Sequence, residues 1–302
     1  MWWVAQAQEP HSVGRHSLGP HVVGQRVVVR RLVRGETGPS GGPALTDLLG
    51  VCEAYADGVL VVRPESGEAV TIPLADVVSG KPVPPRASVR DRVPAREAQV
   101  HGFALFPDLV TTPVGDWVLR DSATATARRA HSVLAFGPSG VEDDVARVVA
   151  HYERPIAAVL TGSPEDRRLT GLGWVPESTE SDTLFQVAGP AQVARALRGR
   201  SSPEATYDER DDWVRVQVGA HATGYAGLRD DWVGLGGLAV DPAHRRQGLG
   251  LAVVDALVGW GAERGATTVF LQVLADNAPA LALYEALGFR THHRYRYLVP
   301  SR

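Results

Sequence analysis

The chain has 302 residues, 44% of them hydrophobic, and a formal net charge of −3 at pH 7. This near-neutral balance excludes the strong basic field of a typical nucleic-acid-binding protein, so nucleic acid is not an expected partner. The lone cysteine, Cys52, excludes an intramolecular disulfide, argues against a cysteine-based metal site and favours a reducing, cytoplasmic compartment. The sequence has no run of about 18 apolar residues, so no membrane-spanning helix is predicted. No metal is expected either.

Residues 20–84 predict a small β module that forms the first domain. A strand pattern covers residues 22–33, shorter ones follow up to residue 72, and Ala56-Asp-Gly58 and Glu65-Ser-Gly67 have the composition of hairpin turns. Several short strands at close spacing are typical of a small barrel. The proline-rich stretch from Lys81 to Pro85 is expected to be the linker that follows it.

Residues 90–198 predict a second, mixed α/β domain. The patterns indicate, in order, a helix at 141–153, a strand at 156–160, a short helix at 166–170, the turn Gly171-Leu-Gly-Trp174 and a strand at 183–187. The same order of elements recurs nearer the C-terminus, which indicates two related halves. The polar residues 201–212 predict a linker between them.

The second half contains a glycine-rich loop that opens a helix. An apolar strand pattern at residues 233–240 leads through His244-Arg-Arg-Gln-Gly-Leu-Gly250 into a helical pattern at residues 251–263. A helix N-terminus offers unpaired N–H groups and about half a positive charge, so it can hold a pyrophosphate. Gly248 and Gly250 let the backbone approach the phosphates, and Arg245 and Arg246 add cationic donors.

A second cluster follows after about 25 residues. The strand pattern at 268–274 leads to Asn277, then to a helix with Ala280, Leu283 and Tyr284, and then to the turn Leu287-Gly-Phe289. Asn277 is also a suitable residue to cap that helix, and Tyr284 also suits a core position on it.

The two clusters together resemble a known enzyme superfamily. Arg-x-x-Gly-x-Gly, from Arg245 to Gly250, and Asn-x-x-Ala-x-x-Leu-Tyr-x-x-x-Gly-Phe, from Asn277 to Phe289, resemble the cofactor motifs of the GNAT superfamily of N-acetyltransferases. The resemblance implies a GNAT fold of class α/β (α+β). It also implies that residues 90–198 are a degenerate GNAT-like half without a cofactor, and residues 205–302 the acetyl-CoA-binding catalytic domain. Residues 20–84 resemble the Src-homology-3-like barrel that precedes the acetyltransferase part in an actinobacterial, histone-acetyltransferase-like group.

The resemblance also implies roles for individual residues. A bulge in the strand that ends at Val240 would splay it from the next strand, and its backbone would pair with the pantetheine arm of acetyl-CoA. Tyr284 would be catalytic, protonating the departing thiolate. The implied cofactor-binding residues are Leu238, Ala239, Val240, Arg245, Arg246, Gln247, Gly248, Leu249, Gly250, Leu251 and Asn277.

The general base is not evident from the sequence. Some members of the superfamily that acetylate protein N-termini carry a glutamate twelve residues before the tyrosine, whereas this chain has Gln272. An amine with a pKa near 10.4 is almost wholly protonated at neutral pH and needs a proton acceptor. The open alternatives are His292, His293, Glu285, Asp276 or solvent.

The acceptor stays open as well. The prediction is acetyl transfer to a primary amine, either a protein lysine or N-terminus or a small-molecule amine, and the alternative is a non-catalytic protein that binds acetyl-CoA. Arg120, Arg128 and Arg129 are candidate contacts to the acceptor, or else members of structural ion pairs. A set of acidic residues could attract a basic peptide: Asp208, Glu209, Asp211, Asp212, Asp230 and Asp231. The N-terminal module is expected either to pack and form a homodimer or to dock a substrate.

Overall fold

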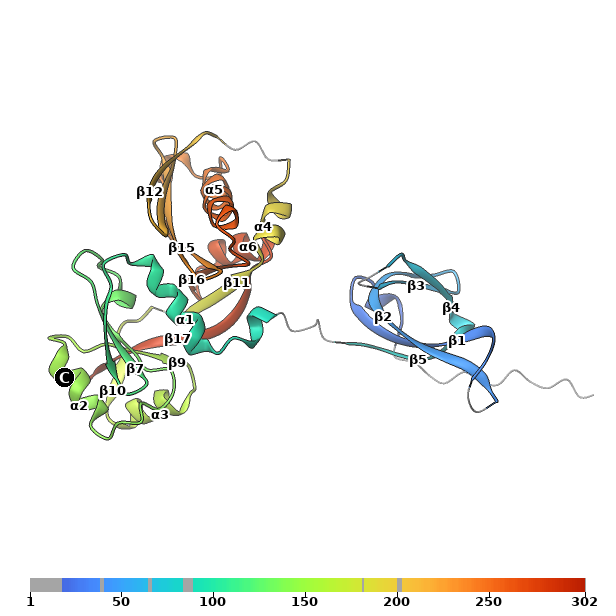
Figure 1. The fold of residues 1–302 in the computed structure, drawn as a ribbon, viewed down its shortest axis with the longest axis horizontal. Helices are drawn as coiled ribbons and strands as arrows, with labels where there is room; N and C mark the ends of the chain where they lie inside the picture. Colours follow the sequence, from blue (N-terminus) through green and yellow to red (C-terminus); the bar gives the residue numbers. More distant parts are fainter. Residues whose placement is uncertain are drawn as a thin grey trace, which may run out of the picture. The chain divides into compact units, whose positions relative to one another are not determined.

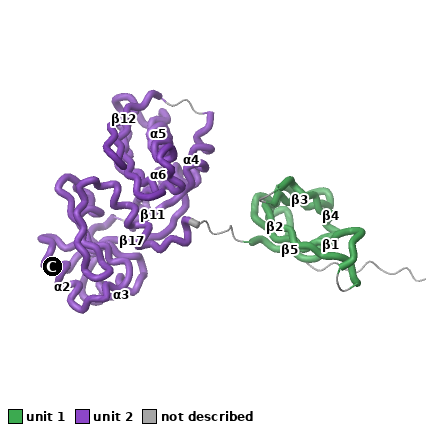
Figure 2. The backbone as a smooth tube through the Cα atoms, in the orientation of Figure 1, with its two compact units in different colours: residues 1–88 green, residues 89–302 purple. Residues whose placement is uncertain are grey.

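The computed structural model describes residues 18–38, 41–64, 67–83, 89–180, 182–199 and 203–301. The chain forms two compact units, residues 1–88 and residues 89–302 (Figure 2). Among the described residues, no helix combines the length and the apolar character needed to cross a membrane.

Unit 1 is a five-stranded antiparallel sheet with the strand order β4-β3-β2-β1-β5. One face encloses an apolar core that includes Val27, Leu60 and Ile72, and the thiol of Cys52 is buried there as well. Its elements are η1 (Pro20–Val22), β1 (Arg26–Thr37), β2 (Pro43–Ala56), β3 (Val59–Pro64), β4 (Val70–Pro73), η2 (Leu74–Asp76) and β5 (Val77–Pro82).

The turn expected at Ala56-Asp-Gly58 joins β2 to β3. Asp57 and Gly58 have φ angles of 53° and 75°, the left-handed pair that a two-residue hairpin turn requires. Glu65 and Ser66 of the second expected turn lie outside the described residues.

The linker predicted from Lys81 to Pro85 is wrong in its first two residues. Lys81 and Pro82 belong to β5 and pair with Val28 and Val27 of β1. A proline is tolerated there because β5 is an edge strand, which needs backbone donors on one side only. Pro84 and Pro85 lie outside the described residues.

The described part of unit 2 is built on one 12-stranded sheet, whose main path runs β12-β13-β14-β15-β16-β11-β17-β9-β8-β7-β6, with β10 paired to β17 (Figure 1). Its strands are β6 (Val110–Val114), β7 (Trp117–Asp121), β8 (Val133–Leu134), β9 (Ala157–Leu160), β10 (Trp174–Pro176), β11 (Thr183–Ala188), β12 (Ala205–Arg210), β13 (Trp213–Val218), β14 (Ala222–Arg229), β15 (Trp232–Val240), β16 (Thr268–Leu274) and β17 (Arg290–Pro300). The helices are η3 (Val89–Arg92), α1 (Ala95–His101), η4 (Gly102–Leu105), η5 (Arg128–Ala130), α2 (Asp144–His151), α3 (Pro164–Gly171), α4 (Pro190–Leu197), η6 (Pro242–His244), α5 (Leu249–Glu263) and α6 (Ala278–Ala286).

The faint internal repeat seen in the sequence is a repeat of structure. β8 and β9 are parallel strands joined through α2, as β15 and β16 are parallel strands joined through α5. α3 and α6 follow in corresponding places, and each is followed by a glycine with φ near 85°, Gly173 and Gly288.

The two halves of unit 2 exchange strands. β11 belongs to the first half by sequence but pairs with β16 of the second, and β17 closes the chain but pairs with β9 of the first. β11 and β17 also pair with each other. The two halves are therefore joined at the centre of the sheet by four adjacent antiparallel strands, β16-β11-β17-β9.

The linker predicted at residues 201–212 is wrong for residues 205–210, which form the edge strand β12. β12 pairs with β13 through a turn at Asp211, whose φ is 45°. Most of its side chains are exposed, so it lacks the alternation of apolar and polar residues that marks a half-buried strand. Ser201 and Ser202 lie outside the described residues.

The two faces of β16 pack against different elements, and this division positions the site. Val269, Leu271 and Val273 join the core formed with α5 and α4. Phe270 faces the other way and packs with Phe185 and with α1 and η4. Side chains alternate between the two faces of a strand, so Gln272 shares the face of Phe270.

Candidate functional site

β15 carries a bulge next to the end of its pairing with β16. Between the pairs Tyr225↔Gly236 and Thr223↔Ala239, β14 has one residue where β15 has two, and Gly237 has a φ of 60°. A side chain is excluded at Gly236, because a Cβ there would lie 2.5 Å from the ring of Tyr225. The bulge expected from the sequence is therefore present, with glycines at the two positions that need them.

The bulge opens the sheet between β15 and β16. The parallel pairing begins at Trp232↔Thr268 and ends at Leu235↔Leu271. Beyond that point, and among the strands that the structure describes, β16 pairs only with β11 and β15 pairs only with β14. Leu238, Ala239 and Val240 therefore present one backbone edge to the gap, and all three are partly or fully exposed.

The glycine-rich loop lies directly after β15 and opens α5. Gly248 is the N-cap with a φ of 82°, and Arg246 also has a positive φ of 65°. Within the described residues, the first amide at this end of α5 with a helical backbone partner is that of Ala252, which donates to the carbonyl of Gly248. The amides of Gly248 to Leu251 thus form an open set of donors at the positive end of a 15-residue helix.

The side chains of this loop are available to a ligand. Arg245, Arg246 and Gln247 are exposed, and Gly248 has open space where a Cβ would lie. Arg245 makes one long contact, 3.4 Å from its Nε to the carbonyl of Val240. Leu249 and Leu251 are partly buried against the core below the loop.

Asn277 caps α6. Its Oδ1 accepts a hydrogen bond of 3.3 Å from the backbone N–H of Ala280, and the residue is exposed. The capping interpretation of this residue is confirmed. Its side-chain NH2 group is not used by the cap, so the same residue retains donors for a ligand.

Tyr284 lies on α6 and is 8% exposed. Its ring packs against Phe289 with centroids 5.7 Å apart and belongs to the apolar cluster that Leu238 of β15 also contacts. Burial raises the pKa of Tyr284, so the phenol is protonated at neutral pH. Tyr284 is therefore a core residue and also has the phenolic proton that a general acid must donate.

The candidate bases differ in their surroundings. Glu285 and Asp276 are exposed. His293 is enclosed, with its Nε2 3.1 Å from Nε2 of Gln99 and its Nδ1 2.7 Å from Nδ1 of His292. Burial, with a smaller effect from His292, lowers the pKa of His293 to about 3, so its imidazole is a weak base.

Gln272 is held by a tyrosine that the sequence did not single out. The hydroxyl of Tyr295 donates to Oε1 of Gln272 at 2.5 Å and lies 3.2 Å from the hydroxyl of Tyr297. A cavity of about 240 Å³ opens beside these groups. It is lined by Ala127, Arg128, Arg129, Glu180, Thr183, Gln272, Val273, Leu274 and Tyr297; we call it the Gln272 cavity.

The three candidate arginines have different environments. Arg128 is ion-paired, with nitrogen–oxygen distances of 2.9 Å to Glu177 and 2.5 Å to Glu180, so its structural interpretation is confirmed. Arg120 is 2% exposed and donates to the carbonyl and hydroxyl of Ser132. Within the described part of the chain neither Arg120 nor Arg129 has a carboxylate within 4.0 Å, so the ion pairs considered for these two are absent there.

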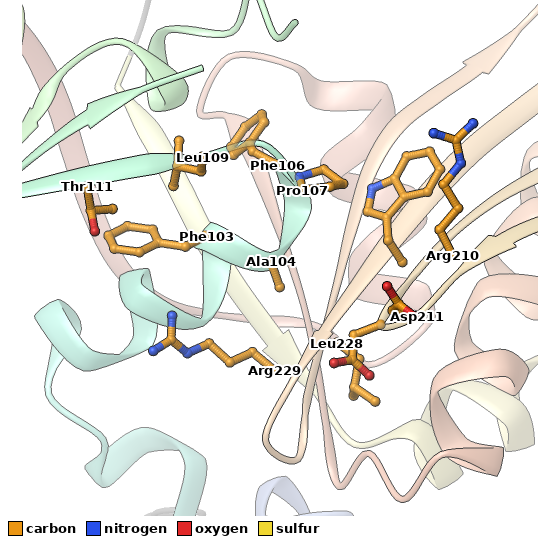
Figure 3. Close-up of a pocket in the computed structure, with 12 residues that line it drawn as sticks. Phe103, Ala104, Phe106, Pro107, Leu109, Thr111, Arg210, Asp211, Leu228 and Arg229 are labelled. Atoms are coloured by element: carbon orange, nitrogen blue, oxygen red, sulfur yellow. The ribbon is translucent and has the colours of Figure 1, made fainter. Parts of the chain in front are cut away.

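A larger cavity of about 620 Å³ lies between η4 with the segment that follows it and the β12–β13 turn (Figure 3). Phe103, Phe106 and Leu109 line one wall, and Arg210 and Asp211 line the other. Its charges are mixed, because Arg210 and Arg229 accompany Asp211 and Asp212. Trp213 lines this cavity and stacks on Tyr225 with ring centroids 5.7 Å apart, so it adjoins the ring that covers the bulge.

One group of side chains has metal-ligand chemistry. His221, Asp241 and His244 each offer a ligand atom, and these atoms lie within 4.8 Å of one another. The two imidazoles are stacked with an interplanar angle of 7° and centroids 3.4 Å apart. A metal ion cannot lie in the planes of two parallel rings at once, so one ring would have to rotate before both could bind the same ion.

The fold and the open sheet define the class of protein. A mixed sheet that splays after a bulge, with a glycine-rich helix N-terminus beside the gap, is the arrangement that the resemblance implied. A GCN5-related N-acetyltransferase from Kribbella flavida has the same fold, with a TM-score of 0.52 and 15% identity over 72% of this chain and 97% of that chain. The expected α+β class and GNAT fold are confirmed.

The sequence comparisons agree on the family. Residues 183–298 match the family model described as "Probable histone acetyltransferase Rv0428c C-terminal". The probable histone acetyltransferase Rv0428c of Mycobacterium tuberculosis is 27% identical over 85% of this chain and 89% of its own length. The resemblance to the GNAT superfamily and to its actinobacterial group is thereby confirmed; the class of the N-terminal barrel stays a prediction.

Another sequence match has a higher identity over a shorter stretch. The [ribosomal protein bS18]-alanine N-acetyltransferase of Escherichia coli K12 is 49% identical over 64 residues, which is 21% of this chain. The chain spans 43% of the length of that enzyme.

Proposed function

We propose that this protein is an N-acetyltransferase that transfers the acetyl group of acetyl-CoA to a primary amine by direct attack. The observation that carries the proposal is the gap between β15 and β16, which lies directly beside the open N-terminus of α5. Acetyl-CoA has a long pantetheine arm that can pair with a strand edge in the gap and a pyrophosphate that can bind the helix N-terminus, so it needs these two features next to each other.

The cofactor would contact three segments. The pantetheine arm would pair with the free backbone edge of Leu238, Ala239 and Val240, as an added strand does. The pyrophosphate would accept hydrogen bonds from the loop between Arg245 and Leu251, with Arg246 and Gln247 at its rim. The Asn277 side-chain amide would donate to the arm while its oxygen keeps the cap of α6.

Two requirements of the chemistry can be assigned to residues. The amine must attack the thioester carbonyl as a free base, and the departing thiolate must be protonated. Tyr284 is the proposed proton donor, because it is a buried, protonated phenol in contact with the cluster that includes Leu238. Gln272 carries no charge, so solvent is the proposed proton acceptor from the amine.

The domain assignment that goes with this function is also a proposal. Residues 205–302 would bind the cofactor, residues 90–198 would shape the acceptor side, and residues 20–84 would be a Src-homology-3-like module for packing or a homodimer. A cytoplasmic location fits the single buried cysteine.

Release of free thiol from acetyl-CoA, with calorimetric binding of acetyl-CoA beside it, tests the activity. We expect Tyr284→Phe to lower kcat by about 100-fold or more with little change in acetyl-CoA affinity, because only the proton is removed. Tyr207→Phe, at an exposed tyrosine of β12, is the matched control and should behave like the wild type. Unchanged turnover in Tyr284→Phe would remove this tyrosine from the mechanism.

The second candidate function is a protein that binds acetyl-CoA without turning it over. It is favoured by Gln272, whose oxygen is occupied by Tyr295 at the place where N-terminal acetyltransferases carry a glutamate. Calorimetric binding without thiol release from any acceptor class would support it over the enzyme.

A further inference from the structure

Among the described residues, Arg129 has no counter-ion. It is half-buried, its Nε is enclosed and has no hydrogen-bond partner, and no described carboxylate lies within 4.0 Å of it. Its electrostatic neighbours are the phenols of Tyr295, Tyr297 and Tyr225. Burial raises the pKa of Tyr297 well above the ordinary value, so this phenol is neutral at pH 7 and does not balance the charge.

A second cation increases the imbalance. Arg120 is buried near two of these tyrosines, Tyr295 and Tyr297, and within the described residues its guanidinium has only neutral partners, the carbonyl and hydroxyl of Ser132 and the ring of Phe103. Burying a charge without a counter-ion is strongly unfavourable. Two such arginines near each other therefore indicate that an anion binds there.

Two of these tyrosines relate Arg129 to the two strands of the open sheet. The ring of Tyr225, an electrostatic neighbour of Arg129, lies on the glycines of the β15 bulge. The hydroxyl of Tyr295 donates to Gln272, the first residue of β16 beyond its pairing with β15. Arg129 and Gln272 line the same cavity, so the guanidinium lies near the part of β16 that borders the gap.

The charge of the Gln272 cavity argues against a purely cationic acceptor. Two arginines line it, and Arg128 is already paired with Glu177 and Glu180, so Arg129 is the lining charge that has no carboxylate partner among the described residues. Lysine side chains and polyamines would be repelled. The volume of about 240 Å³ is below the range of about 300–1,000 Å³ of drug-sized ligand sites, so it suits a small acceptor.

We propose that the acceptor is a small α-amino acid whose carboxylate binds Arg129 while its amine faces Gln272 and the thioester. A guanidinium matches a carboxylate with two parallel hydrogen bonds, and this pairing places the neighbouring amine at a fixed distance. The inference rests on the proposed acetyltransferase function and names its substrate class.

Matched acceptor pairs test the proposal with the wild-type protein. Thiol release is measured for each of the common L-amino acids and for its α-amide, which keeps the amine and the side chain but loses the carboxylate. The amide has the less basic amine and is the more reactive nucleophile at neutral pH, so a preference for the acid cannot come from amine reactivity. We expect at least one acid to exceed its amide in kcat/KM by about tenfold or more.

Arg129→Gln should reduce this preference to about threefold or less, mainly through KM, and Arg129→Lys should keep part of it. Arg154→Gln, at an exposed arginine paired with Glu177, is the control and should keep the full preference.

Thermal unfolding separates a role of Arg129 in binding the acceptor from a structural role. Arg129→Gln should melt no lower than the wild type, since it loses an unpaired cation, and the preferred amino acid should raise the melting temperature of the wild type only.

Three outcomes would overturn the inference: amides that equal or exceed every acid, no transfer to any amino acid, or a destabilised Arg129→Gln with the preference intact. Calorimetric binding of acetyl-CoA is measured in the same experiment. Binding with transfer to amides or peptides alone would leave the proposed function standing, whereas loss of both binding and transfer would remove the proposed function too.

Discussion

The two halves of unit 2 place a helix at corresponding points, α2 in the first and α5 in the second, but the N-termini of these helices differ. In the second half, α5 begins at Gly248 with open amides and no acidic residue in its first turn. In the first half, α2 begins at Asp144, a carboxylate that is 1% exposed. Its oxygens accept from the amide of Val145 at 2.6 Å, from the hydroxyl of Ser139 at 2.5 Å and from Arg168 at 2.7 Å.

The first half thus supplies its own anion where the second half is open to one. Burial by itself would raise the pKa of Asp144, but the hydrogen bonds from Arg168, Ser139 and the Val145 amide outweigh it and lower the pKa. The comparison teaches that one local structure can be a ligand site or part of the core, depending on whether a side chain of the chain itself fills it.

The largest expected effect concerns the shared sheet. A chain of residues 203–302 alone should not fold, because β16 and β17 would lose β11, their common neighbour. A chain of residues 89–302 should fold cooperatively. Circular dichroism and urea unfolding check both, and a cooperative transition in the shorter chain would show that the halves are independent.

The role of the open N-terminus of α5 can be tested with the same substitution at two glycines, one in each half of unit 2. Gly248→Asp should weaken acetyl-CoA binding by about 100-fold or more, about 2.7 kcal/mol, since it places a negative charge among the phosphate donors. Gly140→Asp is the matched control, because both glycines are exposed, have positive φ and have open space at the Cβ position. Calorimetry should give wild-type affinity for the control, and equal losses in the two variants would refute the loop assignment.

The closed helix terminus should matter for stability instead of binding. Asp144→Asn should lower the free energy of unfolding by about 2 kcal/mol, because the charge that holds Arg168 and the helix amides is lost. Asp143→Asn, one residue earlier, removes only an exposed pair with Arg147 and should change it by about 0.5 kcal/mol or less. Urea unfolding measures both, and similar losses would contradict the assigned role.

A pH-dependent effect is expected where β17 of the second half pairs with β9 of the first. His293 has a folded pKa of about 3, below the value of about 6.5 of an unfolded histidine, so the unfolded chain takes up a proton first as pH falls. Its contribution to stability is therefore complete above pH 6.5 and is lost toward pH 3, by at most about 1.4 kcal/mol per pH unit.

Urea unfolding at pH 7 and pH 5 should show a smaller pH dependence in His293→Asn than in the wild type. His151→Asn, at an exposed histidine of α2, is measured beside it as the same substitution at the surface. A pH dependence unchanged by the His293 substitution would contradict its buried, neutral state.

The sequence predicted most elements of unit 2 near the site because their signals are local. The strand expected at residues 268–274 is β16 to the residue, and the helix expected at 251–263 begins two residues earlier as α5 (Leu249–Glu263). The edge strand β12 was missed because exposed strands lose their apolar alternation, and the end of β5 was missed because Lys81-Pro82 begins a proline-rich stretch that resembles a linker.

Sequence by itself determined the local features of the proposed cofactor half: glycines at left-handed positions, a helix that starts after a strand, and an asparagine cap are properties of neighbouring residues. Only the tertiary structure brought together the residues of the proposed acceptor side. Arg129, Tyr225, Gln272 and Tyr295 come from η5, β14, β16 and β17, and the exchange of β11 and β17 between the halves brings them together. The physical reason is that charge balance is a sum over contacts between distant segments, so an arginine without a counter-ion can be recognised only after folding.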